Sequence, residues 1–265
     1  MRVLRERKGQ FIIIAALLLS IMIISVSTVI YGTVTYFRHE RWEEYVTIID
    51  SVKTGSSNVL EISLANYAQT LNSTILRDNL NQWIRDVRKA YPGFGVDLSY
   101  TLATGVRSAY GVSLNYSLGL ARTWNQQVSF SGANATFNIN IASAGLTGYN
   151  FTTHAFLKMN IRDTIWYSKD SKQYVVIYLS VDKDGPEPII NLQKSNFVEV
   201  KLSGSSKTFT MKRYYSSAYS YFIYEIQTSV GSAPPPGPTS VEVTMQDTRG
   251  IKTVSYSTSI QENNK

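Results

Sequence analysis

An uncharged run of 27 residues, Phe11 to Phe37, constrains this chain more than any other feature. It begins FIIIAALLLS and ends YGTVTYF. As a helix rising about 1.5 Å per residue it would reach roughly 40 Å, more than the roughly 30 Å hydrocarbon core of a bilayer. Core helices of globular domains seldom stay apolar on every face over such a length. We therefore expect residues 10–37 to form one transmembrane helix.

The charges on either side of this run predict its orientation. Residues 1–9 form a short tail with four basic side chains and one acidic side chain: Arg2, Arg5, Arg7, Lys8 and Glu6. The residues directly after Phe37 mix both signs. Because basic flanks tend to stay in the cytoplasm, we expect a single-pass protein of the cell membrane with a cytoplasmic N-terminus and an extracytoplasmic region from residue 38 onward.

The composition of the remaining chain indicates a folded, β-rich region. The net charge is +7, but the first nine residues supply +3 of it, and the rest is spread without clusters of basic and aromatic residues. We therefore expect no nucleic-acid partner. The chain has no cysteine, which excludes disulfides, thiol catalysis and iron–sulfur clusters. Its 18 tyrosines, together with frequent Ser and Thr, favour strands.

The helical segment after the membrane run spans residues 38–91, with an interruption expected at Thr54 to Ser57, where Gly55 can end one helix and a hydroxyl can cap the next. Two stretches share an apolar 4-3-4 spacing: Leu60, Leu64, Tyr67 and Leu71, then Leu76, Leu80, Trp83 and Val87. Each spacing makes one apolar stripe. We expect the stripes to pack on the protein's own β domain, with an intermolecular coiled coil as the alternative.

The period changes to two between residues 96 and 163. Apolar residues alternate with polar ones in three stretches: Val96, Leu98, Tyr100 and Leu102; Val112, Leu114, Tyr116 and Leu118; Phe137, Ile139 and Ile141. This alternation predicts an antiparallel sheet with one buried face. Residues 38–163 therefore form, by expectation, an α+β domain in which a helical stalk packs on the sheet.

A second β unit is expected at residues 164–260. Seven candidate strands are residues 164–167, 174–181, 197–202, 207–211, 221–226, 241–245 and 251–257. Their spacing predicts a β-sandwich able to fold by itself. The stretch, above all its last hairpin from Val241, resembles immunoglobulin-like and fibronectin-like modules of cell-surface proteins. Residues 232–239 (SAPPPGPT) should be a stiff connector and residues 261–265 a frayed tail.

The N-terminus carries a second resemblance. Arg7-Lys8-Gly9-Gln10, followed at once by FIIIAALLL, is similar to the class III signal of archaeal type IV pilin-like proteins. In that family a membrane peptidase cuts after the glycine, and the freed apolar helices bundle in a filament core. The resemblance implies processing between Gly9 and Gln10. Ile14 departs from the bacterial pattern, which has a glutamate there.

Two alternatives use the same residues. An uncleaved signal anchor also combines a basic tail with an apolar helix, and it needs no glycine. A conventional signal peptidase could instead cut after Ser27, at the small-x-small site Ser25-Val26-Ser27, but this would leave an exposed apolar N-terminus from Thr28.

Motifs for catalysis or metal binding are missing from the sequence. The two histidines, His39 and His154, are far apart and belong to no HExxH pattern, and neither G-x-S-x-G nor GxxxxGK[ST] occurs. Residues 182–185 (DKDG) resemble the start of a calcium loop but lack its downstream ligands, which favours a tight turn. We expect no catalytic residues, no cofactor and no metal site.

Four N-x-[ST] sequons are candidate glycosylation acceptors: Asn72, Asn115, Asn134 and Asn150. About three such triplets arise by chance at this content of Asn, Ser and Thr, so their number alone is uninformative.

The sequence thus predicts a membrane-anchored cell-surface structural or adhesion protein, with a pilin-like subunit that self-assembles through its N-terminal helix as one form of it. The alternative is a single-pass anchored binding module that recognises a protein or glycan partner. A nine-residue cytoplasmic tail is too short for a signalling domain, and an ectoenzyme has the least support.

Overall fold

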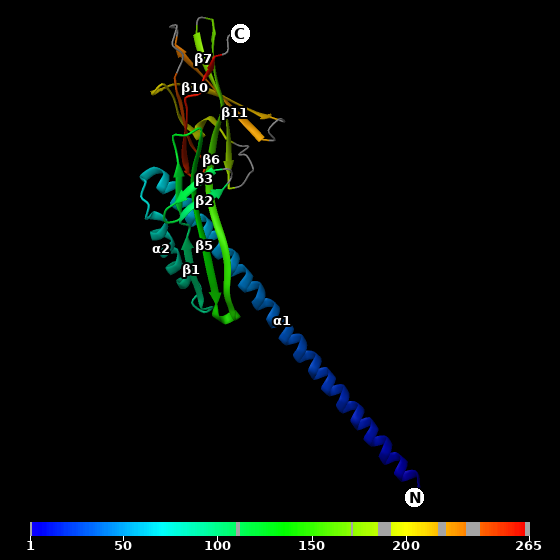
Figure 1. The fold of residues 1–265 in the computed structure, drawn as a ribbon. Helices are drawn as coiled ribbons and strands as arrows, with labels where there is room; N and C mark the ends of the chain where they lie inside the picture. Colours follow the sequence, from blue (N-terminus) through cyan, green and yellow to red (C-terminus); the bar gives the residue numbers. More distant parts are fainter. Residues whose placement is uncertain are drawn as a thin grey trace. The chain divides into compact units, whose positions relative to one another are not determined.

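The computed structural model describes residues 2–109, 112–170, 172–184, 192–216, 221–231 and 239–262 (Figure 1). The chain divides into two units, residues 1–51 and 52–265. Helix α1 (Arg2–Thr70) supplies the described part of the first unit and continues into the second. Each unit is treated by itself below.

The first unit contains the apolar segment. The stretch Ile12–Val34 is helical over 23 residues, has a mean hydropathy of 2.7, and buries none of its side chains in the protein. It is long and apolar enough to span a membrane, as expected for the helix of residues 10–37.

Helix α1 passes through Gly55 without a break, so the predicted interruption at Thr54 to Ser57 is wrong. The reason is a contact between helices. A β-carbon at residue 55 would overlap the indole ring of Trp83 on α2 (Ile75–Ala90), and the Trp83 Nε1 donates a hydrogen bond to the Ser56 Oγ at 3.1 Å. Glycine and serine here let an aromatic ring approach α1 closely.

Helix α1 ends at Thr70, 13 residues beyond Ser57. After Thr70, Leu71 adopts a positive φ of 61°, and its N–H donates to the Tyr67 carbonyl at 2.8 Å. The predicted apolar stripes are buried in most positions, including Leu60, Leu64, Leu76, Leu80 and Val87, whereas Leu71 is exposed. Helix α2 packs against strand β1.

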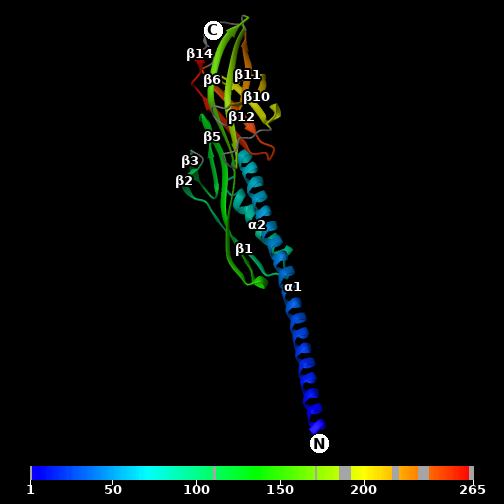
Figure 2. The ribbon, with the colours of Figure 1, turned by 90° about the vertical axis from the view of Figure 1, so that its right-hand side faces the viewer.

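The largest sheet is antiparallel apart from one short parallel pair. Its strands are β1 (Val96–Leu102), β4 (Leu120–Thr123), β5 (Val128–Ile141), β6 (Leu146–Lys169), β7 (Lys172–Lys183), β10 (Phe209–Ser216), β11 (Tyr221–Gly231) and β14 (Gln261–Glu262). Their order is β1-β5-β6-β7-β11-β10; β4 pairs with β5, and β14 pairs in parallel with β6. The two longest strands, β5 and β6, run side by side (Figure 2).

Two smaller sheets complete the second unit. The four-stranded sheet, in the order β13-β12-β8-β9, consists of β8 (Phe197–Leu202), β9 (Ser205–Ser206), β12 (Val241–Gln246) and β13 (Lys252–Ser257). Strands β2 (Gly105–Ala109) and β3 (Val112–Tyr116) form a hairpin, and two short 3-10 helices are η1 (Ala142–Ala144) and η2 (Lys194–Asn196).

The four-stranded sheet packs on the large one through β13, which lies against β5 and β6. Two hydroxyls join the layers: the Ser131 Oγ donates to the Lys252 carbonyl at 2.6 Å, and the Ser255 Oγ donates to the Met159 carbonyl at 3.2 Å. These strands bury apolar side chains such as Phe130, Leu157 and Val254 together with small hydroxyl side chains such as Ser131 and Ser255.

This arrangement confirms the α+β class and does not confirm an immunoglobulin-like sandwich. The expected domain boundary between residues 163 and 164 falls inside β6, which continues from Leu146 to Lys169. Expected strands 164–167, 174–181, 207–211 and 221–226 lie wholly or partly in β6, β7, β10 and β11 of the large sheet, while 197–202, 241–245 and 251–257 fall in the four-stranded sheet.

Two segments were expected to form no strand: the tail, residues 261–265, and the connector, residues 232–239. In the predicted frayed tail, Gln261 and Glu262 pair with Ile165 and Trp166 of β6, so these two residues are ordered as β14. Residues 263–265 lie outside the described part of the chain. So does most of the predicted connector, residues 232–238.

Candidate functional site

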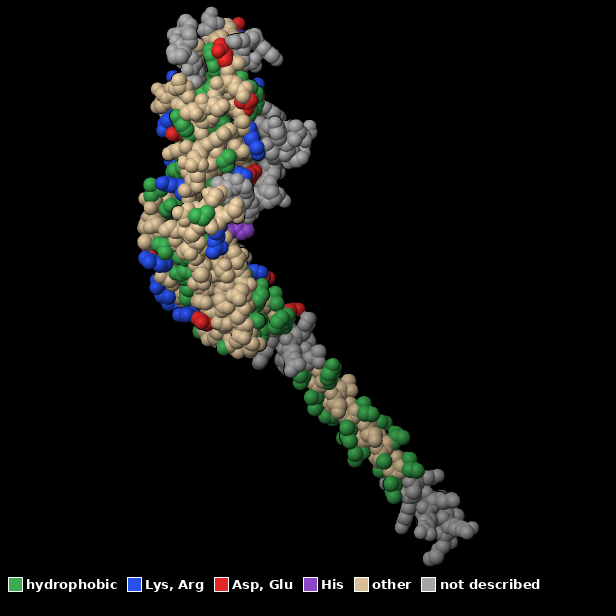
Figure 3. Space-filling view, viewed as in Figure 1, with side chains coloured by type: hydrophobic (Ala, Val, Ile, Leu, Met, Phe, Trp, Pro, Cys, Tyr) green, Lys and Arg blue, Asp and Glu red, His purple; other side chains and the backbone are tan. Residues whose placement is uncertain are grey.

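The apolar surface of α1 is the most distinctive chemical feature of the chain. Every residue from Ile12 to Val34 is exposed, and Figure 3 shows apolar side chains along the visible face of this part of the helix. Three of its hydroxyl groups bond within the helix: Ser20, Thr28 and Thr33 each donate to the backbone carbonyl four residues earlier, at 2.8 Å. Hydroxyls bonded to their own helix backbone are compatible with lipid or with other apolar helices.

The predicted processing residues lie at the start of this helix. Gly9 and Gln10 have helical backbones within α1, directly before the exposed apolar stretch. The side chain of Gln10 lies outside the described part of the chain, as does that of His39. Sequence position, rather than side-chain geometry, therefore defines this candidate cleavage site.

A cluster of charges inside the second unit was not anticipated from the sequence. The Arg249 side chain is only 9% exposed, and its guanidinium lies 2.7 Å from the Asp247 carboxylate, 2.6 Å from Asp184 and 3.4 Å from Glu61. The Arg249 Nη2 also donates to the Phe156 carbonyl at 3.0 Å. One arginine thus ties together helix α1, strand β6, the end of β7 and the turn between β12 and β13.

Burial alone would lower the pKa of Arg249, but the adjacent Asp247 and Asp184 outweigh it and hold that pKa above its ordinary value. The guanidinium is therefore charged throughout the physiological range. Four hydrogen bonds of the guanidinium, from its five N–H groups, go to acceptors of the protein. We interpret the cluster of Arg249, Asp247, Asp184 and Glu61 as a structural element that joins these parts of the fold, and we name it the charge clamp.

Residues 182–185, which resemble the start of a calcium loop, use two carboxylates for contacts within the protein. Asp182 pairs with Lys158 at 3.4 Å, and burial raises the pKa of Asp182 while Lys158 partly offsets the effect. Asp184 accepts from the Phe156 N–H at 2.7 Å and from Arg249. These two carboxylates serve protein contacts, and within the described ranges no three His, Cys, Asp or Glu side chains come together as metal ligands.

His154 lies on the exposed face of β6. Its Nε2 is 3.2 Å from the Asp184 carbonyl oxygen, and its ring lies 6.4 Å from that of Phe156. These contacts agree with a packing and hydrogen-bonding role.

The four sequons occupy different environments. Asn72 is exposed in the loop between α1 and α2, where its Oδ1 accepts from the Thr74 N–H at 3.0 Å. Asn115 on β3 and Asn150 on β6 are exposed, whereas Asn134 on β5 is half-buried. All four remain candidate acceptors, with Asn72 in the most accessible backbone setting.

Two of these sequons belong to a polar face that covers β1, β5 and β6. Across β5 and β6 the Thr136 and Thr152 hydroxyls are 3.0 Å apart, and the Asn138 Nδ2 donates to the Asn150 Oδ1 at 2.8 Å. Strand alternation places residues i and i+2 on one face. A strand with Asn and Thr facing solvent therefore creates N-x-T triplets, which accounts for the sequons at Asn134 and Asn150 without glycosylation.

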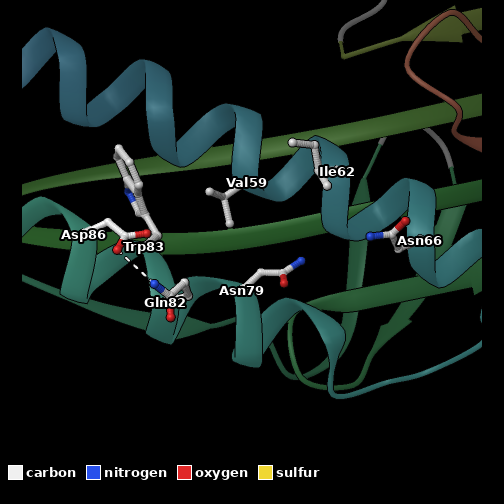
Figure 4. Close-up of a pocket in the computed structure, with 7 residues that line it drawn as sticks. All are labelled: Val59, Ile62, Asn66, Asn79, Gln82, Trp83 and Asp86. Atoms are coloured by element: carbon white, nitrogen blue, oxygen red, sulfur yellow. Dashed lines mark hydrogen bonds between the residues drawn. The ribbon is translucent and has the colours of Figure 1, made fainter.

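Two surface hollows of the second unit are candidate ligand sites. The first, of about 260 Å³, lies between α1 and α2 (Figure 4) and is lined by Val59, Ile62, Asn66, Asn79, Gln82, Trp83 and Asp86. Several of its polar side chains already have partners: the Gln82 Nε2 donates to Asp86 at 2.9 Å, and the Asn79 Nδ2 donates to the Ser63 Oγ at 2.9 Å. The residues that line this hollow do not include a nucleophile paired with a general base.

The second hollow, of about 450 Å³, is lined by Tyr174, Lys194, Thr208, Phe209, Thr210, Gln227, Thr228 and Ser229. Its one charged side chain, Lys194, lies over the Phe209 ring at 5.0 Å. Unlike the first hollow, which includes Asp86, this described lining carries no carboxylate or imidazole that could act as a general base.

Comparison with known proteins adds no family: no protein-family model, no curated protein and no solved structure matches this chain.

Proposed function

We propose that the protein is a cell-surface structural or adhesion protein, anchored in a membrane by residues 10–37, and that it is a pilin-like subunit able to assemble through this helix. The observation that supports the proposal is the fully exposed apolar surface from Ile12 to Val34. The protein acts in this proposal by display and assembly, without catalysis.

Removal of the basic tail gives the proposed assembly a physical reason. Four cationic side chains at the helix end are costly to move from the headgroup region into an apolar bundle. Cleavage between Gly9 and Gln10 would remove all four. The positive-inside tendency places this tail in the cytoplasm, with residues 38–265 on the outer side.

Small residues favour close helix packing after cleavage. Ala16 and Ser20 are one turn apart on the exposed surface, and the Ser20 hydroxyl is already bonded to the Ala16 carbonyl at 2.8 Å. Small residues at this spacing let helix backbones approach each other within lipid-like surroundings.

The N-terminus of the native protein tests this proposal. We expect N-terminal sequencing and intact mass to give a mature start at Gln10, and a Gly9→Leu variant to keep Met1. A Gly32→Leu variant is the matched control, because a side chain at Gly32 meets no atom within 4 Å and should leave processing unchanged.

Other starts would contradict pilin-like processing. An intact Met1 in the native protein would favour the alternative of an anchored binding module, and a start at Thr28 would indicate conventional secretion. Protease added to intact, wall-free cells tests the topology separately: residues 38–265 should be digested, and a protected C-terminus would refute the orientation.

A further inference from the structure

The four sequons differ in whether their backbone belongs to a strand. Asn115 lies in β3, Asn134 in β5 and Asn150 in β6, and each is paired with a residue of a neighbouring strand. Asn72 lies in the loop between α1 and α2. An enzyme that modifies a folded protein must bind the backbone around its target residue. A loop can leave its place at far less than the global free energy of unfolding, so the loop sequon is the one that such an enzyme can reach.

The hydrogen bonds of this loop are local. The Leu71 N–H donates to the Tyr67 carbonyl at 2.8 Å, and the Asn72 N–H donates to the Thr70 hydroxyl at 3.4 Å. Among the described residues, no hydrogen bond of residues 71–74 reaches a strand. The loop can therefore separate from the folded unit without breaking a strand ladder.

The two ends of the Asn72 side-chain amide have different surroundings. Its Oδ1 accepts from the Thr74 N–H at 3.0 Å and from the Thr74 hydroxyl at 3.1 Å, which fixes the turn. Its Nδ2 donates to no group in the part of the chain that the structure describes, and the residue is exposed. The Nδ2 is the atom that receives the sugar in N-glycosylation. A glycan on this atom would therefore leave both hydrogen bonds of the Oδ1 in place.

The strand sequons lack this arrangement. Asn134 is half-buried. Asn150 is exposed, but its Oδ1 accepts from the Asn138 Nδ2 across the ladder at 2.8 Å. Asn115 is exposed, and its backbone pairs with that of Val106 in the β2–β3 hairpin. The folded domain would have to open a strand ladder to bring any of these three sequons into the site of an enzyme.

We propose that Asn72 carries an N-linked glycan added after the domain has folded, and that the three strand sequons carry none. In this reaction a bond forms between the Asn72 Nδ2 and the anomeric carbon of a sugar. The bond from that carbon to the phosphate of a lipid-linked glycan donor breaks, and the Nδ2 gives up one proton to a base of the transferase. The proposal rests on the extracytoplasmic placement of residues 38–265 in the proposed function, because the transfer takes place on exported chains.

Tryptic peptides of the full chain, purified from its own cells, test the assignment. Trypsin separates residues 54–77 with Asn72, residues 108–122 with Asn115, and residues 123–158 with the other two sequons. We expect mass spectrometry with fragmentation to find the added mass of a glycan on Asn72. The peptides 108–122 and 123–158 should have their unmodified masses.

Variants of the same peptide make the test specific. Asn72→Gln should abolish the added mass. Thr74→Ala should also abolish it, because the N-x-[ST] pattern requires the hydroxyl, whereas Thr74→Ser should keep it. Asn58→Gln is the matched control: Asn58 is exposed on α1 within the same tryptic peptide but begins no sequon, so its replacement should leave the glycan unchanged.

Three results would overturn the proposal: an unmodified peptide 54–77, an added mass that persists in Asn72→Gln, or a glycan on any strand sequon, since the last would mean that the fold does not select the site. The protease test of topology separates this proposal from the proposed function. An unmodified Asn72 in a protein whose residues 38–265 are digested from outside would refute the glycan and leave the membrane anchor in place. A protected C-terminus would refute both.

Discussion

The contact between Gly55 and Trp83 gives the sharpest prediction of stability. A Gly→Ala change inside a helix normally stabilises a protein by about 1 kcal/mol. At residue 55 the sign should reverse, because the added methyl group would overlap the Trp83 indole.

The magnitude follows from two opposing effects. Overpacking a close contact costs about 1–3 kcal/mol, and displacing the indole also endangers the Trp83–Ser56 hydrogen bond, worth about 1 kcal/mol. After subtraction of the helix-propensity gain, we expect Gly55→Ala to lower the free energy of unfolding by about 1–3 kcal/mol.

A double-mutant cycle isolates the contact. In a Trp83→Ala background the obstacle is gone, so Gly55→Ala should stabilise by about 0.5–1 kcal/mol. The assay is urea unfolding of the full chain in detergent, followed by far-UV circular dichroism, for wild type, both single variants and the double variant. An equal loss of stability in both backgrounds would refute the steric explanation.

Two further predictions concern charges. Arg249→Met leaves Asp247 buried without its cation, so it should lower the free energy of unfolding by about 3–5 kcal/mol. The matched change Arg88→Met removes an exposed ion pair and should cost less than about 1 kcal/mol. Equal losses for the two variants in urea unfolding would contradict the charge clamp. Because burial raises the pKa of Asp182 despite Lys158, stability from this group is full below the ordinary Asp pKa and is lost as the pH rises through the raised value. The stability of Asp182→Asn relative to wild type should therefore increase over that pH window, and a constant difference would argue against it.

The helices show where sequence signals suffice. Period-3.6 spacing located the buried Leu60, Leu64, Leu76 and Leu80, because it depends on which face of a helix is apolar. Gly55 was read as a break because glycine is locally unfavourable in helices. Its role depends on Trp83, a residue distant along the chain, and a local rule contains no information about that contact.

The strands show a different limit. Their positions follow from alternation, but their assignment to sheets depends on long-range pairing. The predicted boundary at residue 163 coincides with a register shift between Ile161 and Asp163 in the β6–β7 ladder. Such an irregularity shifts the alternation of buried residues, while the strand itself continues across the predicted boundary.

The candidate sites also differ in how far the sequence alone predicts them. The apolar helix is visible in the sequence because twenty or more uncharged residues are themselves the signal. The charge clamp around Arg249 is formed by side chains from α1, from the end of β7 and from the turn between β12 and β13, which come together only in the folded chain.

Strand β6 also has a consequence for how the second unit opens. Between Leu157 and Asn160 it is bonded on both sides, to β5 and to β7, so neither ladder can separate without exposing part of the other. Proteins commonly open through small local units at far less than the global free energy. A strand segment that belongs to two ladders couples such openings, and hydrogen exchange at residues 157–160 should therefore report complete unfolding. A fragment starting at residue 164 would lack this strand segment and should not fold by itself.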